Sequence, residues 1–122
     1  MLIALWIVNA LLALAFLGAG LMKVARPAAA LQAVGMTWIE DFGPASAKLI
    51  GALEVIGALG LILPLLTGVA PILAPLAAVG LAVLMIGATV VHLRRKESAT
   101  PGLVLGVVSV VSAVLGFLVV PG

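Results

Sequence analysis

The chain has 122 residues, of which 66% are hydrophobic and only 8% are charged. Soluble domains are about half apolar and a quarter charged, and a chain of this size cannot hide so much apolar surface from water. We therefore expect an integral membrane protein whose main partner is the lipid bilayer. Six Lys and Arg against four Asp and Glu give a net charge of +2. Because these basic residues form no stripe along which phosphates could bind, no nucleic-acid partner is expected.

Four apolar segments are long enough to cross a bilayer, and they cover residues 2–22, 45–66, 71–93 and 102–120. At a rise of 1.5 Å per residue the first would span about 31 Å, close to the thickness of the hydrocarbon core. Short linkers join the second span to the third and the third to the fourth, so these neighbours should be antiparallel. The sequence thus predicts an all-α, four-helix membrane bundle that forms one domain over residues 1–122.

The linker between the first two spans is longer, and residues 27–35 within it can form a short helix because Leu31 and Val34 lie one turn apart. Trp38 follows, and tryptophan is enriched where membrane meets water. Two interpretations fit this segment. It is either an interfacial helix or re-entrant turn at the lipid headgroups, or an ordinary polar loop with a tryptophan anchor.

The basic residues predict the orientation of the chain. All of them flank the first linker or occupy the third, and they are Lys23, Arg26, Lys48, Arg94, Arg95 and Lys96. Positive charge accumulates on the cytoplasmic side of membrane proteins. We therefore expect a multi-pass protein with both termini on the non-cytoplasmic side.

Small residues recur at helical spacing, and they allow helices to approach closely in lipid, where no hydrophobic force brings them together. The stripes are Gly102, Gly106, Ser109, Ala113 and Gly116 in the last span, Ala47, Gly51 and Ala58 in the second, and Gly80 and Gly87 in the third. We interpret them as contacts within the bundle. The stripe of the last span is also a candidate surface for a homo-oligomer.

Glu54 is the residue least compatible with lipid, since it lies about 13 Å into the second span. A charged group at such depth costs a few kcal/mol or more and usually faces a bundle interior or a wet cavity. Two roles are open to it: a functional group in a pocket, or a structural hydrogen bond between helices.

Three further polar residues lie on inward faces of their helices, and each also has a structural interpretation. Asn9 and Lys23 share one face of the first span, whereas His92 continues an apolar stripe of the third. Asn9 could join helices by hydrogen bonds, Lys23 could be a snorkelling anchor, and His92 could be an interfacial histidine. A contact between Lys23 and Glu54 requires the long lysine side chain to reach inward.

Several kinds of chemistry have no matching motif. The chain has no cysteine, which excludes thiolate nucleophiles and iron–sulfur clusters. A single histidine cannot provide both axial ligands of a haem, and no His, Asp and Glu cluster has metal-binding spacing. No metal site is therefore expected.

The sequence as a whole resembles the DoxX-like family of small bacterial four-helix membrane proteins. The resemblance is carried by LGAGLMK at 17–23, LIGALEVIGALG at 49–60, and GA at 87–88 with VH at 91–92. It implies a four-helix fold in a bacterial inner membrane, with Lys23, Glu54 and His92 lining an internal site. Relatives include a subunit of a thiosulfate:quinone oxidoreductase, which implies a link to membrane redox chemistry.

Two functions fit these observations. The first is a quinone- or lipophile-binding subunit of a membrane oxidoreductase system. In it, Glu54 and His92 would accept and release protons, and Lys23 would supply positive charge. Asn9 would be a further ligand contact, and a redox partner protein would carry the electrons. The second is a non-catalytic assembly factor or small transporter with a polar cavity. Both an enzymatic and a non-enzymatic role therefore stay open.

Overall fold

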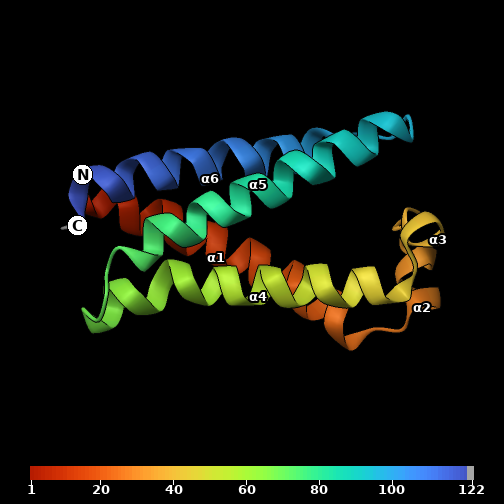
Figure 1. Ribbon diagram of the computed structural model, residues 1–122, viewed down its shortest axis with the longest axis horizontal. Helices are drawn as coiled ribbons and strands as arrows, with labels where there is room; N and C mark the ends of the chain where they lie inside the picture. Colours follow the sequence, from red (N-terminus) through yellow and green to blue (C-terminus); the bar gives the residue numbers. More distant parts are fainter. Residues whose placement is uncertain (121–122) are drawn as a thin grey trace.

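A computed structural model describes residues 1–120 as a bundle of four long helices (Figure 1). The long helices are α1 (Leu2–Ala25), α4 (Pro44–Thr67), α5 (Leu73–Arg94) and α6 (Thr100–Val119), and two short ones, α2 (Ala28–Ala33) and α3 (Ile39–Phe42), lie between α1 and α4. Each long helix is apolar and long enough to cross a membrane. The predicted all-α, four-helix membrane fold is confirmed.

Prolines and glycines set the ends of α4 and α5. Pro44 occupies the first turn of α4, where its missing N–H has no helical partner to lose. Gly68 ends the helix in the left-handed conformation, with a φ of 74°, and its N–H donates to the carbonyl of Pro64. The third span was expected to begin at Pro71, but α5 begins two residues later because Pro71 and Ile72 form a turn.

The four long helices form a ring in which α1 contacts α4 and α6, and α5 also contacts α4 and α6. The contacts between α1 and α4 and between α5 and α6 are more extensive than those between α4 and α5. Figure 1 shows the reason: the two pairs converge at the end where α1 begins and α6 ends, and they diverge toward the opposite end. The bundle is therefore closed at one end and splayed at the other.

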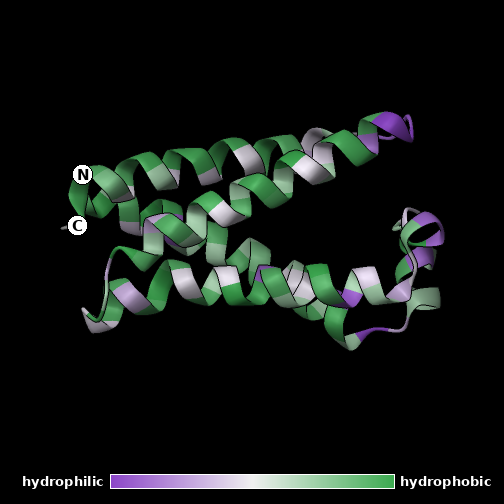
Figure 2. Cartoon of the chain, in the orientation of Figure 1, coloured by the Kyte–Doolittle hydropathy of each residue, from purple (hydrophilic) through white to green (hydrophobic). Residues whose placement is uncertain are grey.

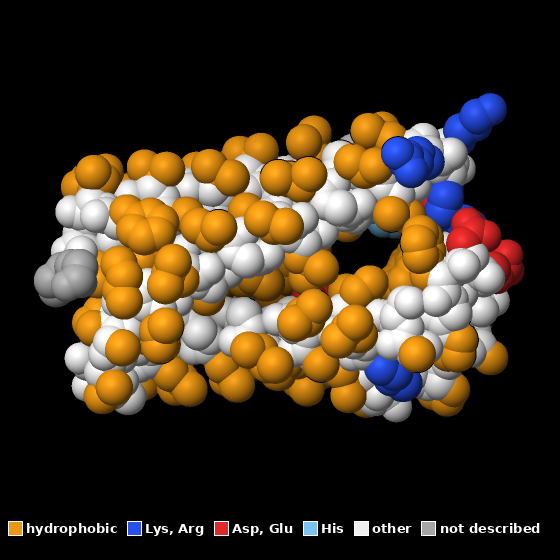
Figure 3. Space-filling model, in the orientation of Figure 1, with side chains coloured by type: hydrophobic (Ala, Val, Ile, Leu, Met, Phe, Trp, Pro, Cys, Tyr) orange, Lys and Arg blue, Asp and Glu red, His pale blue; other side chains and the backbone are white. Residues whose placement is uncertain are grey.

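The core lies in the closed part of the bundle, where apolar side chains from all four long helices meet. It consists of Leu12, Phe16, Ala58, Leu61, Ala78, Leu81, Met85 and Ala113. Large apolar side chains also cover the outside of the helices (Figure 3), as expected of surfaces that face lipid. Hydrophilic residues gather at the splayed end (Figure 2).

We call this splayed end the basic end, since α1 and α5 finish there with Lys23 and Arg94 and α4 begins there with Lys48 in its first turns. Figure 3 shows the Lys and Arg side chains at this end, opposite the start of α1. The predicted gathering of positive charge on one side of the bundle is thus present. The short helix expected within residues 27–35 is also present, as α2.

The stripe of small residues on α6 packs inside the bundle, against α5. A Cβ on Gly116 would lie 2.8 Å from Cβ of Pro75, and one on Gly106 would lie 3.3 Å from Cβ of Met85. Its interpretation as a bundle contact is therefore confirmed. Its use as a free oligomer surface is wrong, because α5 covers it.

The two glycines of the third span behave differently. A Cβ on Gly80 or Gly87 would meet no atom within 4 Å among the described residues, and both positions are exposed. Their prediction as bundle contacts is wrong, since α4 and α6 pack on other faces of α5. Gly87 instead borders a cavity.

Candidate functional site

The candidate site is built where α1 and α4 cross. A Cβ placed on Gly20 would lie 2.7 Å from the carbonyl oxygen of Gly51, and one placed on Gly51 would lie 2.7 Å from that of Gly20. Lys23 lies opposite Gly51, and Glu54 lies opposite Gly20, with Cβ distances of 2.8 Å and 3.1 Å to the added atoms. Each glycine therefore makes room for the charged residue of the other helix.

Lys23 and Glu54 form an ion pair at this crossing. The Nζ of Lys23 donates to Oε1 of Glu54 at 2.6 Å, and the two residues are 13% and 2% exposed. The predicted approach of the lysine across the helices is thus present. The second carboxylate oxygen of Glu54 has no hydrogen-bond partner within residues 1–120, and this oxygen is not fully buried.

Lys48 holds the end of α1 in position. Its Nζ donates to the carbonyl oxygens of Lys23, Val24 and Arg26 at 3.2, 2.7 and 2.7 Å. These carbonyls lie at the C-terminus of a helix, where backbone acceptors lack helical partners and a positive charge is favourable. Lys48 therefore caps α1 in addition to contributing to the charge of the basic end.

A cavity of about 700 Å³ lies beside the ion pair, in the splayed part of the bundle. Its wall is mostly apolar, with Lys23, Ser46, Glu54 and His92 as its polar and titratable side chains. Leu49 of α4 and Val83 of α5 border it and are 62% and 63% exposed, so the cavity opens sideways between these helices. Figure 3 shows the molecule hollowed here, with apolar side chains around the rim.

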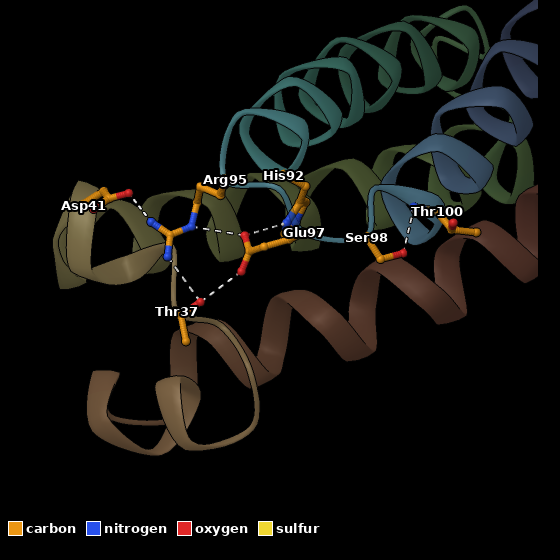
Figure 4. A network of polar contacts seen from close by, with 7 residues as sticks. All are labelled: Thr37, Asp41, His92, Arg95, Glu97, Ser98 and Thr100. Carbon is orange, nitrogen blue, oxygen red and sulfur yellow. Dashed lines mark hydrogen bonds and ion pairs between the residues drawn. The ribbon is translucent and has the colours of Figure 1, made fainter.

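A network of polar side chains, which we call the mouth network, lies at the basic end (Figure 4), and its His92 also lines the cavity. It consists of Thr37, Asp41, His92, Arg95 and Glu97. Glu97 accepts from the Thr37 hydroxyl at 3.0 Å and from Nε of Arg95 at 3.1 Å, and it pairs with Nδ1 of His92 at 3.3 Å. The guanidinium of Arg95 also donates to Thr37 at 3.3 Å and to Asp41. The network thus joins the α2–α3 segment to the α5–α6 loop.

The mouth network keeps Glu97 ionised. The hydroxyl of Thr37, followed by His92 and the guanidinium of Arg95, holds the pKa of Glu97 below its usual range, against the opposing effect of partial burial. A carboxylate can only accept hydrogen bonds. Its neighbours in the network are therefore donors toward it.

Three of the four predicted site residues border the same cavity, namely Lys23, Glu54 and His92. His92 pairs with Glu97, however, and not with Glu54. Asn9 lies outside the cavity, in the closed part of the bundle. Its amide donates to the carbonyl of Leu61 at 2.9 Å and accepts from the Ser112 hydroxyl at 2.5 Å. These bonds match its alternative interpretation, a residue that joins helices.

Sequence reasoning missed three members of the mouth network, namely Glu97, Thr37 and Asp41. Glu97 had a usable signal, since it is an acid only five residues after the single histidine of the chain. Thr37 and Asp41 had none, because they lie more than fifty residues away and meet Arg95 only through the fold. Within the described residues no group of three or more His, Asp or Glu could hold a metal ion.

The fold and the site define a class, a four-span helical membrane protein with a buried Lys–Glu pair on the wall of a cavity that opens sideways between α4 and α5. A sequence model of the DoxX-like family matches residues 7–120, which is nearly the whole chain. The chain belongs to the DoxX-like family, and the resemblance seen in its sequence is confirmed. Searches of curated proteins and of solved structures found no match to the chain.

Proposed function

We propose that this protein binds a lipid-soluble molecule with a small polar head, with quinones and quinols as the fitting class, in the cavity between α4 and α5. The observation that carries the proposal is the placement of one buried ion pair, Lys23–Glu54, on an otherwise mostly apolar wall. Ligand sites are concave and mostly apolar, with few polar groups that fix orientation. The opening between α4 and α5 would admit such a molecule from the bilayer of a bacterial inner membrane.

The polar groups of the cavity suit the chemistry of a quinol. Oxidation of a quinol to a quinone releases two protons and two electrons. The free carboxylate oxygen of Glu54 can accept one hydroxyl proton, and His92 can accept another at the mouth. Lys23 would stabilise negative charge on the ligand oxygen during transfer. The two electrons would pass to a partner redox protein, so the chain would act as a membrane subunit of an oxidoreductase system.

Trp38 provides a direct test, because it borders the cavity and the chain has only two tryptophans and no tyrosine. In the Trp6→Phe variant, reconstituted in lipid nanodiscs, Trp38 is the sole reporter. A short-tailed ubiquinone or menaquinone analogue should quench its fluorescence with saturation. Replacing Glu54 by Gln should raise the apparent Kd about tenfold, which corresponds to the loss of about 1.4 kcal/mol.

Trp38→Phe is the matched control, since it leaves Trp6 near the opposite end of α1. Quenching of Trp6 should rise linearly with the quinone dissolved in the lipid and should not respond to Glu54→Gln. Linear quenching of both tryptophans would overturn the proposal. A protein that instead purifies with a stoichiometric partner and no small molecule would favour the assembly-factor alternative.

A further inference from the structure

The loop after α5 turns back so that Glu97 faces His92. The backbone N–H of Glu97 donates to the carbonyl of His92 at 2.9 Å, and that of Lys96 donates to the carbonyl of Leu93 at 3.1 Å. Lys96 adopts the left-handed conformation, with a φ of 57°, which reverses the chain within these few residues. This tight turn places Oε1 of Glu97 3.3 Å from Nδ1 of His92.

Glu97 is itself held in place by residues other than His92. Thr37, in the segment between α2 and α3, donates to Oε2, whereas Nε of Arg95 donates to Oε1. Asp41 of α3 in turn accepts from Arg95. Both carboxylate oxygens are therefore engaged, and the carboxylate cannot rotate away from His92 without losing these bonds.

The tautomer of His92 follows from these contacts. A neutral imidazole carries its proton on one nitrogen, and the hydrogen bond made by one nitrogen decides the state of the other. Since the Glu97 carboxylate is an acceptor, Nδ1 of His92 must carry the proton that lies between them. Nε2 then has a free lone pair, and it makes no hydrogen bond with any residue from 1 to 120.

We propose that Glu97 is a positioning residue that holds His92, which lines the cavity, as the Nδ1–H tautomer and thereby leaves its Nε2 free as a proton acceptor. That a ligand hydroxyl donates to Nε2 rests on the function proposed above. The assignment of the tautomer does not depend on that function. A group that accepts at Nε2 selects ligands that bring a hydrogen-bond donor. The reduced, hydroxyl-bearing form of a quinone is such a ligand, and the oxidised form is not.

Nitrogen NMR of the protein labelled with ¹⁵N-histidine tests this inference, because the chain has one histidine and therefore gives one pair of ring signals. The spectrum is recorded at about pH 9 and again at a higher pH, and the tautomers are assigned where the two spectra agree, so that only the neutral forms contribute. We expect the protonated type of signal on Nδ1 and the unprotonated type on Nε2. A wild-type spectrum dominated by Nε2–H, the form that the side chain of free histidine favours, would overturn the proposal.

Two variants separate positioning from a merely structural role. Glu97→Gln keeps an acceptor oxygen and should retain the Nδ1–H tautomer, whereas Glu97→Ala should lose it. Glu40→Ala is the control, because Glu40 is an exposed acid at the same end of the bundle. An unchanged tautomer in folded Glu97→Ala would contradict the proposal, and the wild-type spectrum decides the matter even if that variant does not fold.

The ligand enters only in a last step. A quinol analogue should shift the Nε2 resonance of the wild type, and the shift should be lost in Glu97→Ala. An Nδ1–H spectrum without any response to quinol supports the positioning role of Glu97 and contradicts the function proposed for the cavity. The two inferences can thus fail separately.

Discussion

Gly20 and Gly51 lie in contact at the crossing of α1 and α4, and each sits opposite the charged residue that follows the other by one turn. Lys23 faces Gly51 and Glu54 faces Gly20, so the lysine reaches one turn deeper to meet the carboxylate. The ion pair is therefore a consequence of the close approach of two backbones. Any group added at the crossing should separate the pair.

Gly20→Ala and Gly51→Ala should each destabilise the protein by about 1–3 kcal/mol, because the added methyl meets a backbone carbonyl that cannot move aside. Thermal unfolding in detergent measures this effect. Gly18→Ala in the same helix is the matched control, since its Cβ would meet no atom of the described chain within 4 Å. Equal melting temperatures for all three variants would show that the crossing is looser than described.

Lys23→Met should destabilise the protein on the order of 3 kcal/mol, because it leaves the buried carboxylate of Glu54 without its partner. The double variant with Glu54→Gln should regain most of this loss, since no buried charge remains. Chemical denaturation of the single and double variants gives the coupling energy. If the double variant recovers stability but not saturable quinone quenching, the pair serves ligand binding. Additive losses would mean that the two side chains do not interact.

Asn9→Ala should cost about 1–2 kcal/mol, because the carbonyl of Leu61 and the hydroxyl of Ser112 lose their partner. Quinone quenching of Trp38 should stay unchanged, since Asn9 lies in the closed part of the bundle. Unfolding and quenching measured on the same preparation test both statements. A weakened quinone response at unchanged stability would return Asn9 to the ligand site.

Stability should fall when the pH drops below the ordinary pKa of glutamate, which is 4.5, because the pKa of Glu97 is lower in the folded protein. A carboxyl group whose pKa is lower in the folded than in the unfolded chain stabilises the fold at pH values above its unfolded pKa. This contribution disappears as the pH falls through its folded pKa. Glu97→Gln should therefore be less stable than the wild type at pH 7, and the difference should vanish at acid pH. Melting curves from about pH 7 to pH 3 test this. A difference that grows toward acid pH would contradict it.

The orientation in the membrane can be measured because the chain has no cysteine. We expect the basic end to face the cytoplasm. A cysteine introduced at Val69, in the exposed turn before α5, should react with a membrane-impermeant maleimide in spheroplasts. A cysteine at Ser98, in the α5–α6 loop, should react only after permeabilisation. The reverse pattern would place both termini in the cytoplasm.

The candidate site was only partly predictable. Glu54, Lys23 and His92 could be selected because a polar group is costly in lipid wherever the helix happens to pack. Asn9 shares a helix face with Lys23, yet Asn9 lies in the closed part of the bundle and Lys23 lies beside the cavity, because the helix pairs diverge along their length. Thr37 and Asp41 could not be selected, since polar residues in a linker between two spans are ordinary in any sequence.

The sequence by itself determined the four spans, their antiparallel order and the end that carries positive charge, because these properties depend on local hydropathy and on linker length. The tertiary structure alone decided which small residues meet a neighbour. The glycines of α6 pack on α5, whereas Gly80 and Gly87 face open space. In lipid, an apolar helix face gains no hydrophobic free energy by leaving an acyl chain for another helix. Composition therefore does not show which faces pack inside the bundle. The same freedom lets the helix pairs splay and leave the cavity beside Lys23 and Glu54.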